Sequence, residues 1–453
     1  MTVDDLPEGL LNRISRAADI VKGCSQFRVI SHYDADGISS AGIVSSVLLR
    51  EGKSFQVTMA KSLEREMVSR LGGEGHECIV FSDMGSGLLT ELERLDAKVV
   101  VLDHHRPSKD SNGVVHINPH LWDIDGMTGA SASAVCMLLA VTVNPENWHL
   151  LPLAFAGVAG DRQDIKDLSG LNAWLMEEGV SRNMAEVRGR SLVPSGPLSV
   201  MTKRFDPYIK GVSGCPEGTA SLLEGMGLVP KERGDDLDDA GRRKLQSLLV
   251  LRLLEQGIEP ETLDELSGKR YFFPAWDMDS GEMASLLDAC GRMGEEGTGL
   301  SLTLGDKTAL KRARELRNDY IDDVLEALDG VEDGIQVMEN IQHFRNEKTN
   351  LSGVVCGITM QYLADRTRPT LVLAEKGGKI RVSSRATFGI LEMGVDLSEA
   401  LKVGAEKVGG HGGGHAIASG ATLPLGRERE FLETVDYVVG EQKKGKGRQI
   451  ISR

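Results

Sequence analysis

The chain has 453 residues, of which 41% are hydrophobic and 26% are charged, and its formal net charge is -15 at pH 7. This length exceeds one ordinary core and predicts two or three domains of a soluble globular protein. The negative charge argues against a broad basic surface that wraps duplex DNA, and it favours a short or single-stranded substrate or a partner protein.

Neither a membrane span nor a secretion signal is indicated. The longest apolar stretch, 135–143, is far shorter than the roughly 20 residues of a membrane-spanning helix. Met1 to Glu8 carries three acids and lacks a basic, apolar signal pattern. The six cysteines include no Cys-x-x-Cys pair, which is typical of reduced core residues. We therefore expect a cytoplasmic protein that does not associate with membranes.

Apolar strands alternate with helical segments from residue 27 to about residue 160. Such alternation predicts βαβ units and a parallel sheet, in which ligands bind beyond the carboxyl ends of the strands. The expected strands are 27–31, 55–60, 78–82, 99–102 and 114–117, and the expected helices are 37–50, 63–71, 88–95 and 130–141.

The pattern becomes mostly helical over 171–333, with helices expected at 240–256 and 307–328. A smaller α/β region follows, with strands at 353–359, 370–374, 380–384 and 416–422. We expect a hairpin turn at Gly377-Gly378 and a helix over 397–408 that ends in the glycine run 409–415.

The predicted fold class is therefore α/β, with an N-terminal parallel-sheet domain, a mostly helical insertion and a smaller C-terminal α/β domain. The expected divisions are 1–190 for the first domain, 191–333 for the insertion and linker, 334–441 for the last domain, and 442–453 for a basic tail. A solvated end is favoured over a binding arm for that tail.

Acids and histidines follow several of the predicted strands. One strand runs into Asp103-His104-His105, the first strand leads into His32-Tyr33-Asp34-Ala35-Asp36-Gly37, and the third leads into Asp83. A fourth acid, Asp161, follows the small-residue stretch 156–160. Carboxylates can bridge two metal ions while imidazoles complete the shells, and this mixed set suits Mn²⁺ better than an all-oxygen Mg²⁺ site. The pattern is typical of a two-metal hydrolase.

Each motif also has a structural alternative. Asp34 and Asp36 are residue types that cap a following helix. Asp83 precedes a glycine-containing turn, the two histidines can be satisfied at a strand edge, and 161–164 can form a helix-terminal polar cluster. Four such coincidences in one α/β segment favour a shared site.

A second candidate site lies near the C-terminus. The glycines of 409–415 allow backbone N–H groups to approach an anion, and His415 can add a charge-assisted hydrogen bond. Arg385, which follows Ser383-Ser384, has a guanidinium suited to phosphate. The alternative is a flexible loop that only ends a helix.

In order and spacing, the N-terminal motifs resemble those of the DHH superfamily of phosphoesterases, and within it the archaeal RecJ-like exonucleases. Gly412-Gly413-Gly414-His415-Ala416 resembles the DHH-associated domain, so the resemblance covers most of the chain. It implies an active-site cleft between the two α/β domains and two bound divalent cations, Mn²⁺ or Mg²⁺. The metal ligands it implies are His32, Asp34, Asp36, Asp83, His104 and Asp161.

The resemblance also implies catalytic and substrate-binding residues. His105 would contact the scissile phosphate, and Asp103 would orient its neighbours. Leu286 to Arg292 resembles the Asn-Ala-Ala-Gly-Arg element of RecJ, with Asp288 in the place of the Asn. The substrate-binding residues would be Arg292, Ser383, Arg385, Gly412, Gly413, Gly414 and His415.

The function that the resemblance implies is metal-dependent exonuclease activity on single-stranded DNA or RNA, releasing mononucleotides, with roles in DNA repair or replication. One alternative is a small-substrate phosphodiesterase for short oligonucleotides or cyclic dinucleotides, although such relatives lack the 171–333 insertion. Another is a replication-fork scaffold whose insertion binds a GINS-type partner.

Overall fold

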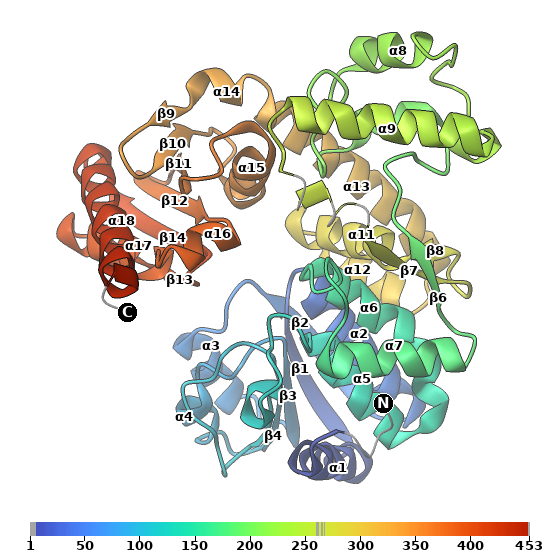
Figure 1. Cartoon of the computed structure of the whole chain (residues 1–453). Helices are drawn as coiled ribbons and strands as arrows, with labels where there is room; N and C mark the ends of the chain where they lie inside the picture. Colours follow the sequence, from blue (N-terminus) through green and yellow to red (C-terminus); the bar gives the residue numbers. More distant parts are fainter. Residues whose placement is uncertain (1–5, 260–261, 264–265, 267, 452–453) are drawn as a thin grey trace. The chain divides into compact units, whose positions relative to one another are not determined.

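The structure is a computed structural model that describes residues 6–259, 262–263, 266 and 268–451 (Figure 1). The chain forms two compact units, one made of Met1–Arg190 with Glu265–Tyr320 and the other of Ser191–Asp264 with Ile321–Arg453. Of the acidic N-terminal segment, residues 1–5 lie outside the described part. No described helix is long and apolar enough to cross a lipid bilayer.

The first unit contains the parallel sheet that the sequence predicts. Its strand order is β2-β1-β3-β4-β5, and every neighbouring pair is parallel. Each strand begins and ends within one residue of its expected bounds. The strands are β1 (Gln26–His32), β2 (Ser54–Ala60), β3 (Cys78–Ser82), β4 (Lys98–Leu102) and β5 (Val115–Ile117).

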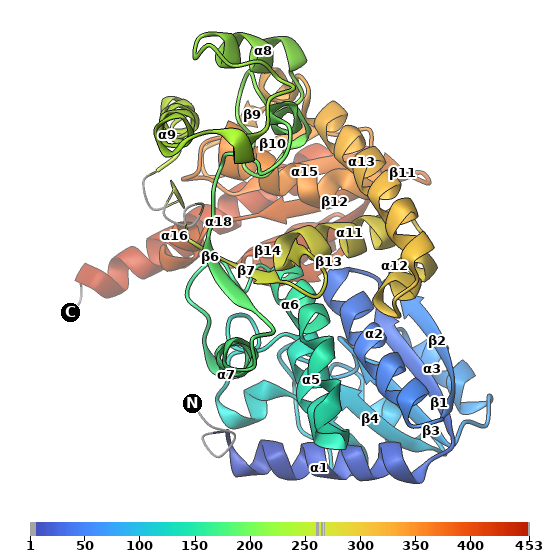
Figure 2. The same ribbon diagram turned by 90° about the vertical axis from the view of Figure 1, so that its right-hand side faces the viewer.

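Helices cover both faces of this sheet (Figure 2). Phe27 and Val29 of β1 pack into the core shared with α1, α2, α5 and α6, whereas Ile30 packs with α3 and α4 on the opposite face. Burial on both faces explains the nearly continuous apolar strands. The helices are α1 (Glu8–Gly23), α2 (Ala35–Arg50), α3 (Arg65–Gly72), α4 (Leu89–Leu92), α5 (Ala132–Val143) and α6 (Leu151–Gly160).

A small antiparallel sheet, β6-β7-β8, lies within the stretch expected to be mostly helical. Tyr271 and Phe273 of β7 pack on Phe155 of α6, with ring centroids 5.7 and 5.8 Å apart, so these aromatics are core residues. The elements here are α7 (Gly170–Ser181), β6 (Glu186–Gly189), β7 (Lys269–Phe273), β8 (Met278–Asp279), α11 (Ser280–Arg292), α12 (Glu296–Thr303) and α13 (Lys307–Leu328).

The second unit is built on a mixed sheet with the strand order β13-β14-β12-β11-β10-β9. The β11–β12 hairpin turns at Gly377 and Gly378, whose φ angles of 61° and 70° confirm the predicted glycine turn. The strands are β9 (Gln336–Val337), β10 (Gln342–Arg345), β11 (Thr370–Lys376), β12 (Lys379–Arg385), β13 (His411–Gly414) and β14 (Ala418–Pro424).

Helices α17 and α18 supply the core on one face of this sheet, where Leu401 and Phe431 pack with Ile380 and Val382. Helix α18 continues to Ile451, so most of the expected tail is helical, and residues 452–453 lie outside the described part. The helices of this unit are α8 (Pro216–Glu224), α9 (Asp239–Glu255), α14 (Val331–Gly334), α15 (Ser352–Ile358), α16 (Phe388–Glu392), α17 (Leu397–Lys407) and α18 (Glu428–Ile451).

Two expectations for the second unit are corrected. The segment 353–359 was expected as a strand because of its β-branched residues, but it forms helix α15. Val355 and Cys356 are buried there, and the Cys356 thiol donates to the Thr370 carbonyl at 3.2 Å, so packing on the sheet overrides the local preference for a strand.

The glycine run is also no simple loop, because His411–Gly414 pairs with β14 as the edge strand β13.

We expect Phe155→Ala to lower the free energy of unfolding by about 3–5 kcal/mol, because it leaves a cavity beneath β7 where the side chain is fully buried. Urea titration followed by circular dichroism would measure the change. Tyr437→Ala, at a ring that is 67% exposed, serves as the control and should change it by less than about 0.5 kcal/mol. If Phe155→Ala lowered the free energy of unfolding by less than about 1 kcal/mol, the expected cavity would not persist and the prediction would be wrong.

Candidate metal centre

The topology of the first sheet gathers the acids and histidines at one edge. After β1 the chain adds β2 on one side and β3 on the other, so the direction of winding changes between β1 and β3. Ligands bind at such a switch point, beyond the carboxyl ends of the strands. His32 ends β1, Asp83 follows β3 and Asp103 follows β4.

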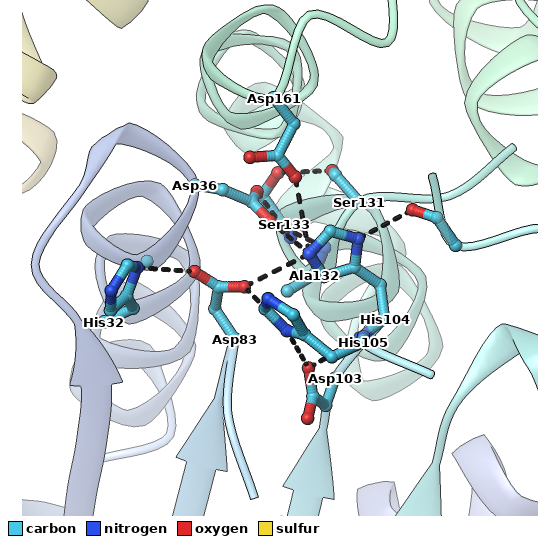
Figure 3. A network of polar contacts seen from close by, with 12 residues as sticks. His32, Asp36, Asp83, Asp103, His104, His105, Ser131, Ala132, Ser133 and Asp161 are labelled. Carbon is cyan, nitrogen blue, oxygen red and sulfur yellow. Dashed lines mark hydrogen bonds and ion pairs between the residues drawn. The ribbon is translucent and has the colours of Figure 1, made fainter. Parts of the chain in front are cut away.

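Asp83 lies at the centre of this edge (Figure 3). Its backbone has a φ of 56°, which is uncommon for a residue other than glycine, and its N–H donates to the Leu102 carbonyl at 2.9 Å. Gly85 permits the turn that follows, with a φ of 118° and Val101 close by. This bend places the carboxylate between His32 and His104, where Asp83 is only 3% exposed.

Three groups of side chains lie close enough to hold metal ions, with their ligand atoms within 4.8 Å of one another. Two of these groups share Asp83. One Asp83 oxygen lies 3.5 Å from His32 Nδ1, and the other lies 3.3 Å from His104 Nε2. The groups are His32 with Asp34 and Asp83, Asp83 with His104 and His105, and Asp36 with His104 and Asp161.

His104 is oriented by the main chain. Its Nδ1 donates to the Gly126 carbonyl at 2.7 Å, which turns Nε2 toward Asp83 and toward Asp161, 3.4 Å away. Gln163 also donates to the Gly126 carbonyl, at 2.9 Å, and its own side-chain oxygen accepts from Asn172. A metal-ligating histidine usually has this kind of partner on its other ring nitrogen. The sequence pattern did not indicate Gln163, Asn172 or Gly126.

Asp36 is buried on helix α2 and is held by the start of α5. Its two oxygens accept from the backbone N–H groups of Ala132 and Ser133 at 2.8 and 3.0 Å. Helix α6 comes so close that a Cβ on Gly157 would stand 2.1 Å from an Asp36 oxygen. The small residues before Asp161 therefore let α6 bring its carboxylate to the same place.

Negative charge is crowded at this edge. Burial and the charge of Asp83 raise the pKa of Asp36 to about 6, and burial with the charge of Asp36 raises the pKa of Asp161 well above its usual value. Burial alone would lower the pKa of His32, but its interactions with Asp34 and Asp83 raise it to about 11. A bound cation would relieve this repulsion.

The donor set fits divalent metal ions. Among the described residues, Asp83 Oδ1 is buried and accepts no hydrogen bond, and its nearest ionic partner is the His104 ring at 3.3 Å, so this oxygen has room to bind a cation. Carboxylate oxygens and imidazole nitrogens are ligands for Mn²⁺, and the oxygens also suit Mg²⁺.

His105 is held by Asp103 beside these groups. Burial alone would lower the pKa of His105, but the 2.8 Å hydrogen bond from its Nδ1 to Asp103 raises it. Burial would raise the pKa of Asp103, but this bond and the charge of His105 lower it to about 2. The other Asp103 oxygen accepts from the Ser86 N–H at 2.9 Å.

A buried polar chain supports this pair from behind. The Ser86 hydroxyl lies 2.9 Å from His116 Nε2 and accepts from Asn118 at 3.0 Å, and Asn118 also donates to the His105 carbonyl. His116 in turn lies 3.1 Å from Asp110. Sequence spacing did not single out Ser86, His116 or Asn118.

Arg292 ends α11 close to the first acidic motif. A Cβ on Gly291 would stand 1.7 Å from the Tyr33 carbonyl, so the helix end packs on the residue before Asp34. Arg292 Nε donates to Asp288 at 2.5 Å, and the described residues provide no other hydrogen-bond partner for its guanidinium. The Asp288 that replaces the Asn of the RecJ element thus pairs with the arginine.

The other expected substrate residues belong to the second unit. Ser383 and Arg385 are on β12, where Arg385 is paired with Ala418 of β14. Gly412, Gly413 and Gly414 are on β13, and His415 forms the turn to β14 with reciprocal backbone bonds to Ala418. The strand register brings Arg385 and His415 to the same end of this sheet.

Two of the structural alternatives, a helix cap at Asp34 and a polar cluster at 161–164, are partly observed. Asp34 caps α2 by accepting from the Gly37 N–H at 3.1 Å, and its other oxygen lies 2.8 Å from His32. Near Asp161, Asp164 is ion-paired with Arg190 at 2.7 Å. Asp34 can therefore cap α2 through one oxygen and still belong, through the other, to the group with His32 and Asp83.

Known proteins are similar to this chain in sequence. The sequence model of the DHH family N-terminal domain matches residues 26–158, and that of the DHHA1 domain matches residues 338–441. An uncharacterized protein of Methanocaldococcus jannaschii is 30% identical over 426 residues, which are 92% of this chain and 93% of that protein.

Solved structures extend the comparison. Exonuclease RecJ bound to manganese has a TM-score of 0.59 at 19% identity, covering 96% of this chain and 95% of that chain. RecJ from Thermus thermophilus in complex with Mn²⁺ has a TM-score of 0.58 at 19% identity, and the match covers 96% of this chain. This chain spans only 55% of the length of that RecJ. CDC45 from Entamoeba histolytica has a TM-score of 0.65 at 11% identity, and the match covers 95% of this chain and 99% of that chain.

The parallel sheet with acids and histidines at its switch point, and the smaller mixed-sheet unit, have the α/β fold of RecJ. The chain belongs to the DHH family of phosphoesterases.

We expect Ser86→Ala to lower the free energy of unfolding by about 1–3 kcal/mol, because it leaves the buried Nε2 of His116 without its partner and removes one of the two hydrogen bonds that the Asn118 amide donates. Ser39→Ala is the matched control, since the buried Ser39 hydroxyl has no hydrogen-bond partner among the described residues, and it should be neutral or stabilising. Urea unfolding of both variants is the measurement. Equal effects would contradict a supporting role for the Ser86 hydroxyl.

Proposed function

We propose that this chain is a metal-dependent exonuclease that removes mononucleotides from single-stranded DNA or RNA and acts in DNA repair or replication. The observation that carries the proposal is the buried Asp83 carboxylate, which is shared by two groups of side chains able to hold metal ions. A small-substrate phosphodiesterase would use the same residues. The match along 95% of a RecJ chain, including the segment between the two sheets, favours the RecJ-like function.

In this proposal two divalent cations, Mn²⁺ or Mg²⁺, are held by His32, Asp34, Asp36, Asp83, His104 and Asp161. When bound, such ions supply a nucleophile from water at neutral pH and neutralise charge on the phosphoryl oxygens. The Gly126 carbonyl keeps His104 Nε2 directed at the acids, and the start of α5 fixes Asp36.

The remaining residues act on the substrate. Asp103 fixes the ring of His105 through Nδ1, so that the ring can contact the scissile phosphate through its other nitrogen. Arg292, held at Nε by Asp288, presents the rest of its guanidinium to a phosphate. Ser383, Arg385, Gly412, Gly413, Gly414 and His415 hold a terminal phosphate or the backbone.

The discriminating experiment uses end-labelled single strands of DNA and RNA, long and very short, incubated with Mn²⁺ or Mg²⁺. A ladder of mononucleotide products from long strands supports the exonuclease. Cleavage of only the shortest strands would instead indicate a small-substrate phosphodiesterase, and an absence of products with either metal would refute hydrolysis.

We expect Asp83→Ala to lower the hydrolysis rate by at least about a hundredfold, because losing a supporting residue around a metal ligand already costs about 10–100-fold. Mn²⁺ binding, followed by electron paramagnetic resonance, should weaken in parallel. Asp96→Ala removes an exposed acid of the same unit and should match the parent chain in both assays. Full activity of purified Asp83→Ala in Mn²⁺ would refute the assignment.

A second candidate role, as a replication-fork scaffold, is favoured by the fold similarity to CDC45. Helix α9 exposes Leu251 and Leu254, by 54% and 41%, on the side of the helix away from its buried residues. We place the binding of a GINS-type partner on this surface.

We expect Leu251→Glu combined with Leu254→Glu to abolish recovery of a GINS-type complex in a pull-down, because charge replaces the apolar contact. Arg252 and Glu255, which form an ion pair on the same helix, can be exchanged for each other as a control that keeps the leucines. Unchanged recovery with the leucine variant would rule out this surface.

A further inference from the structure

A histidine lies among apolar residues in the sheet of the first unit, and the proposed mechanism assigns it no role. Val115 and Ile117 of β5 face the core shared with α1 and α5, so His116 between them faces the other side of the sheet. There its strand partner is Val101 of β4, and the side chain of His116 is fully buried. A buried imidazole needs hydrogen-bond partners on its ring nitrogens, and those partners indicate what the ring does.

The Nδ1 side of this ring is held by helix α1. His116 Nδ1 lies 3.1 Å from an oxygen of Asp110. Arg13 of α1 donates to the same oxygen at 2.8 Å and also to the His116 carbonyl at 2.8 Å. The hydrogen bond from Arg13 holds the pKa of Asp110 below its usual range, so the carboxylate is ionised at neutral pH and only accepts. Nδ1 of His116 therefore carries a hydrogen and donates to Asp110.

The Nε2 side faces the turn that follows β3. Burial lowers the pKa of His116 despite the neighbouring Asp110, so the ring is neutral and Nε2 carries no hydrogen. The Ser86 hydroxyl, 2.9 Å from Nε2, accepts from the Asn118 amide at 3.0 Å. Its own hydrogen then points at Nε2, the nearby acceptor. His116 thus fixes the Ser86 side chain in one orientation, and Asp110 fixes His116.

Ser86 is also the residue that holds Asp103. The Ser86 N–H donates to one Asp103 oxygen at 2.9 Å, and the other oxygen accepts from His105 Nδ1 at 2.8 Å. Asn118 donates to the His105 carbonyl at 2.8 Å as well as to the Ser86 hydroxyl. The turn after β3 and the segment after β4 are therefore both tied to β5 and to the residue that follows it, neither of which supplies a candidate metal ligand.

We propose that His116 is a positioning residue for the hydrolysis: by fixing the Ser86 hydroxyl it fixes Asp103, and through Asp103 the ring of His105 that meets the phosphate. The inference rests on the proposed function and adds to it a residue outside the metal centre. A histidine that only filled the core would be replaced equally well by a polar side chain bonded on either side. A positioning histidine requires the bond between Nε2 and Ser86.

Two variants of His116 separate positioning from core filling, because each keeps a hydrogen bond on one side only. The amide of His116→Gln reaches the place of Nε2 and accepts from Ser86, whereas the amide of His116→Asn reaches the place of Nδ1 and donates to Asp110. With an end-labelled single strand of DNA in Mn²⁺, we expect His116→Gln to keep kcat within about threefold of the parent chain and His116→Asn to lower it about 10–100-fold. KM should stay within about twofold in both, because His116 touches no substrate.

Nuclear magnetic resonance gives a readout that does not require hydrolysis. In the full chain labelled with ¹⁵N-histidine and kept in EDTA, the His105 Nδ1–H that donates to Asp103 should give the same resonance in the parent chain and in His116→Gln. His116→Asn should shift this resonance upfield, because a hydrogen bond that lengthens deshields its proton less. The signal is assigned by its absence from His105→Ala.

Mn²⁺ affinity, measured by electron paramagnetic resonance, should equal that of the parent chain in both variants, because the hydrogen bonds of His116 reach no candidate metal ligand. A loss of Mn²⁺ affinity in His116→Asn as large as its loss of kcat would overturn a role that acts through His105.

Asp110→Ala reaches the same ring from an exposed position, so it tests the inference even if His116→Asn does not fold. It leaves His116 Nδ1 without its acceptor, so the ring is no longer fixed. We expect the His105 resonance to shift and kcat to fall at least about threefold. Asp96→Ala, at another exposed acid of the unit, should match the parent chain in both readouts.

Equal losses of kcat in His116→Gln and His116→Asn, or an unshifted His105 resonance in both His116→Asn and Asp110→Ala, would overturn the inference. A parent chain that degrades no strand but shows the expected shifts keeps the positioning of His105 by His116 and refutes the exonuclease. A parent chain that degrades the strand, while His116→Asn and Asp110→Ala leave kcat and the resonance unchanged, refutes the role of His116 alone.

Discussion

A single buried carboxylate, Asp83, held between two histidines, organises the first unit's site. Placing a carboxylate out of water is costly, and its left-handed backbone adds a further cost of about 1–3 kcal/mol. Interactions with His104 and His32 hold the pKa of Asp83 well below its usual value despite burial, which would raise it. The sheet, the Gly85 turn and the helix ends all serve to keep this group charged and in place.

Much of this site could be predicted because strand ends obey simple rules. A parallel sheet buried on both faces has apolar strands, and its carboxyl ends meet at one edge, so Asp83 and Asp103 had to be neighbours once the strands were recognised. The contacts that orient the site could not be predicted. The Gly126 carbonyl accepts from His104, 22 residues earlier, and from Gln163, 37 residues later, and no local pattern records such pairings.

The second unit shows where local pattern and packing disagree. The strands β11, β12 and β14 follow from alternation, and the Gly377-Gly378 turn follows from the need for positive φ. Helix α15 does not, because the same β-branched residues that favour a strand are buried equally well by a helix lying on β11 and β12. The paired edge strand β13 was likewise hidden by its glycines, which carry no side-chain alternation.

The two units differ in electrostatic character. Acids and histidines are gathered in the site of the first unit, whereas Lys379 and Arg381 are exposed on β12 of the second unit.

The hydrogen bond from His104 to Gly126 carries a consequence for how such a centre can vary. The acceptor is a main-chain oxygen, yet position 126 requires glycine, because a Cβ there would stand 2.0 Å from the His104 carbonyl and would push the two backbones apart. The tilt of the imidazole therefore depends on the path of the loop 123–130, which carries the buried Gly126. Insertions or deletions in that loop would reorient this imidazole while leaving every acid and histidine of the candidate site in the sequence.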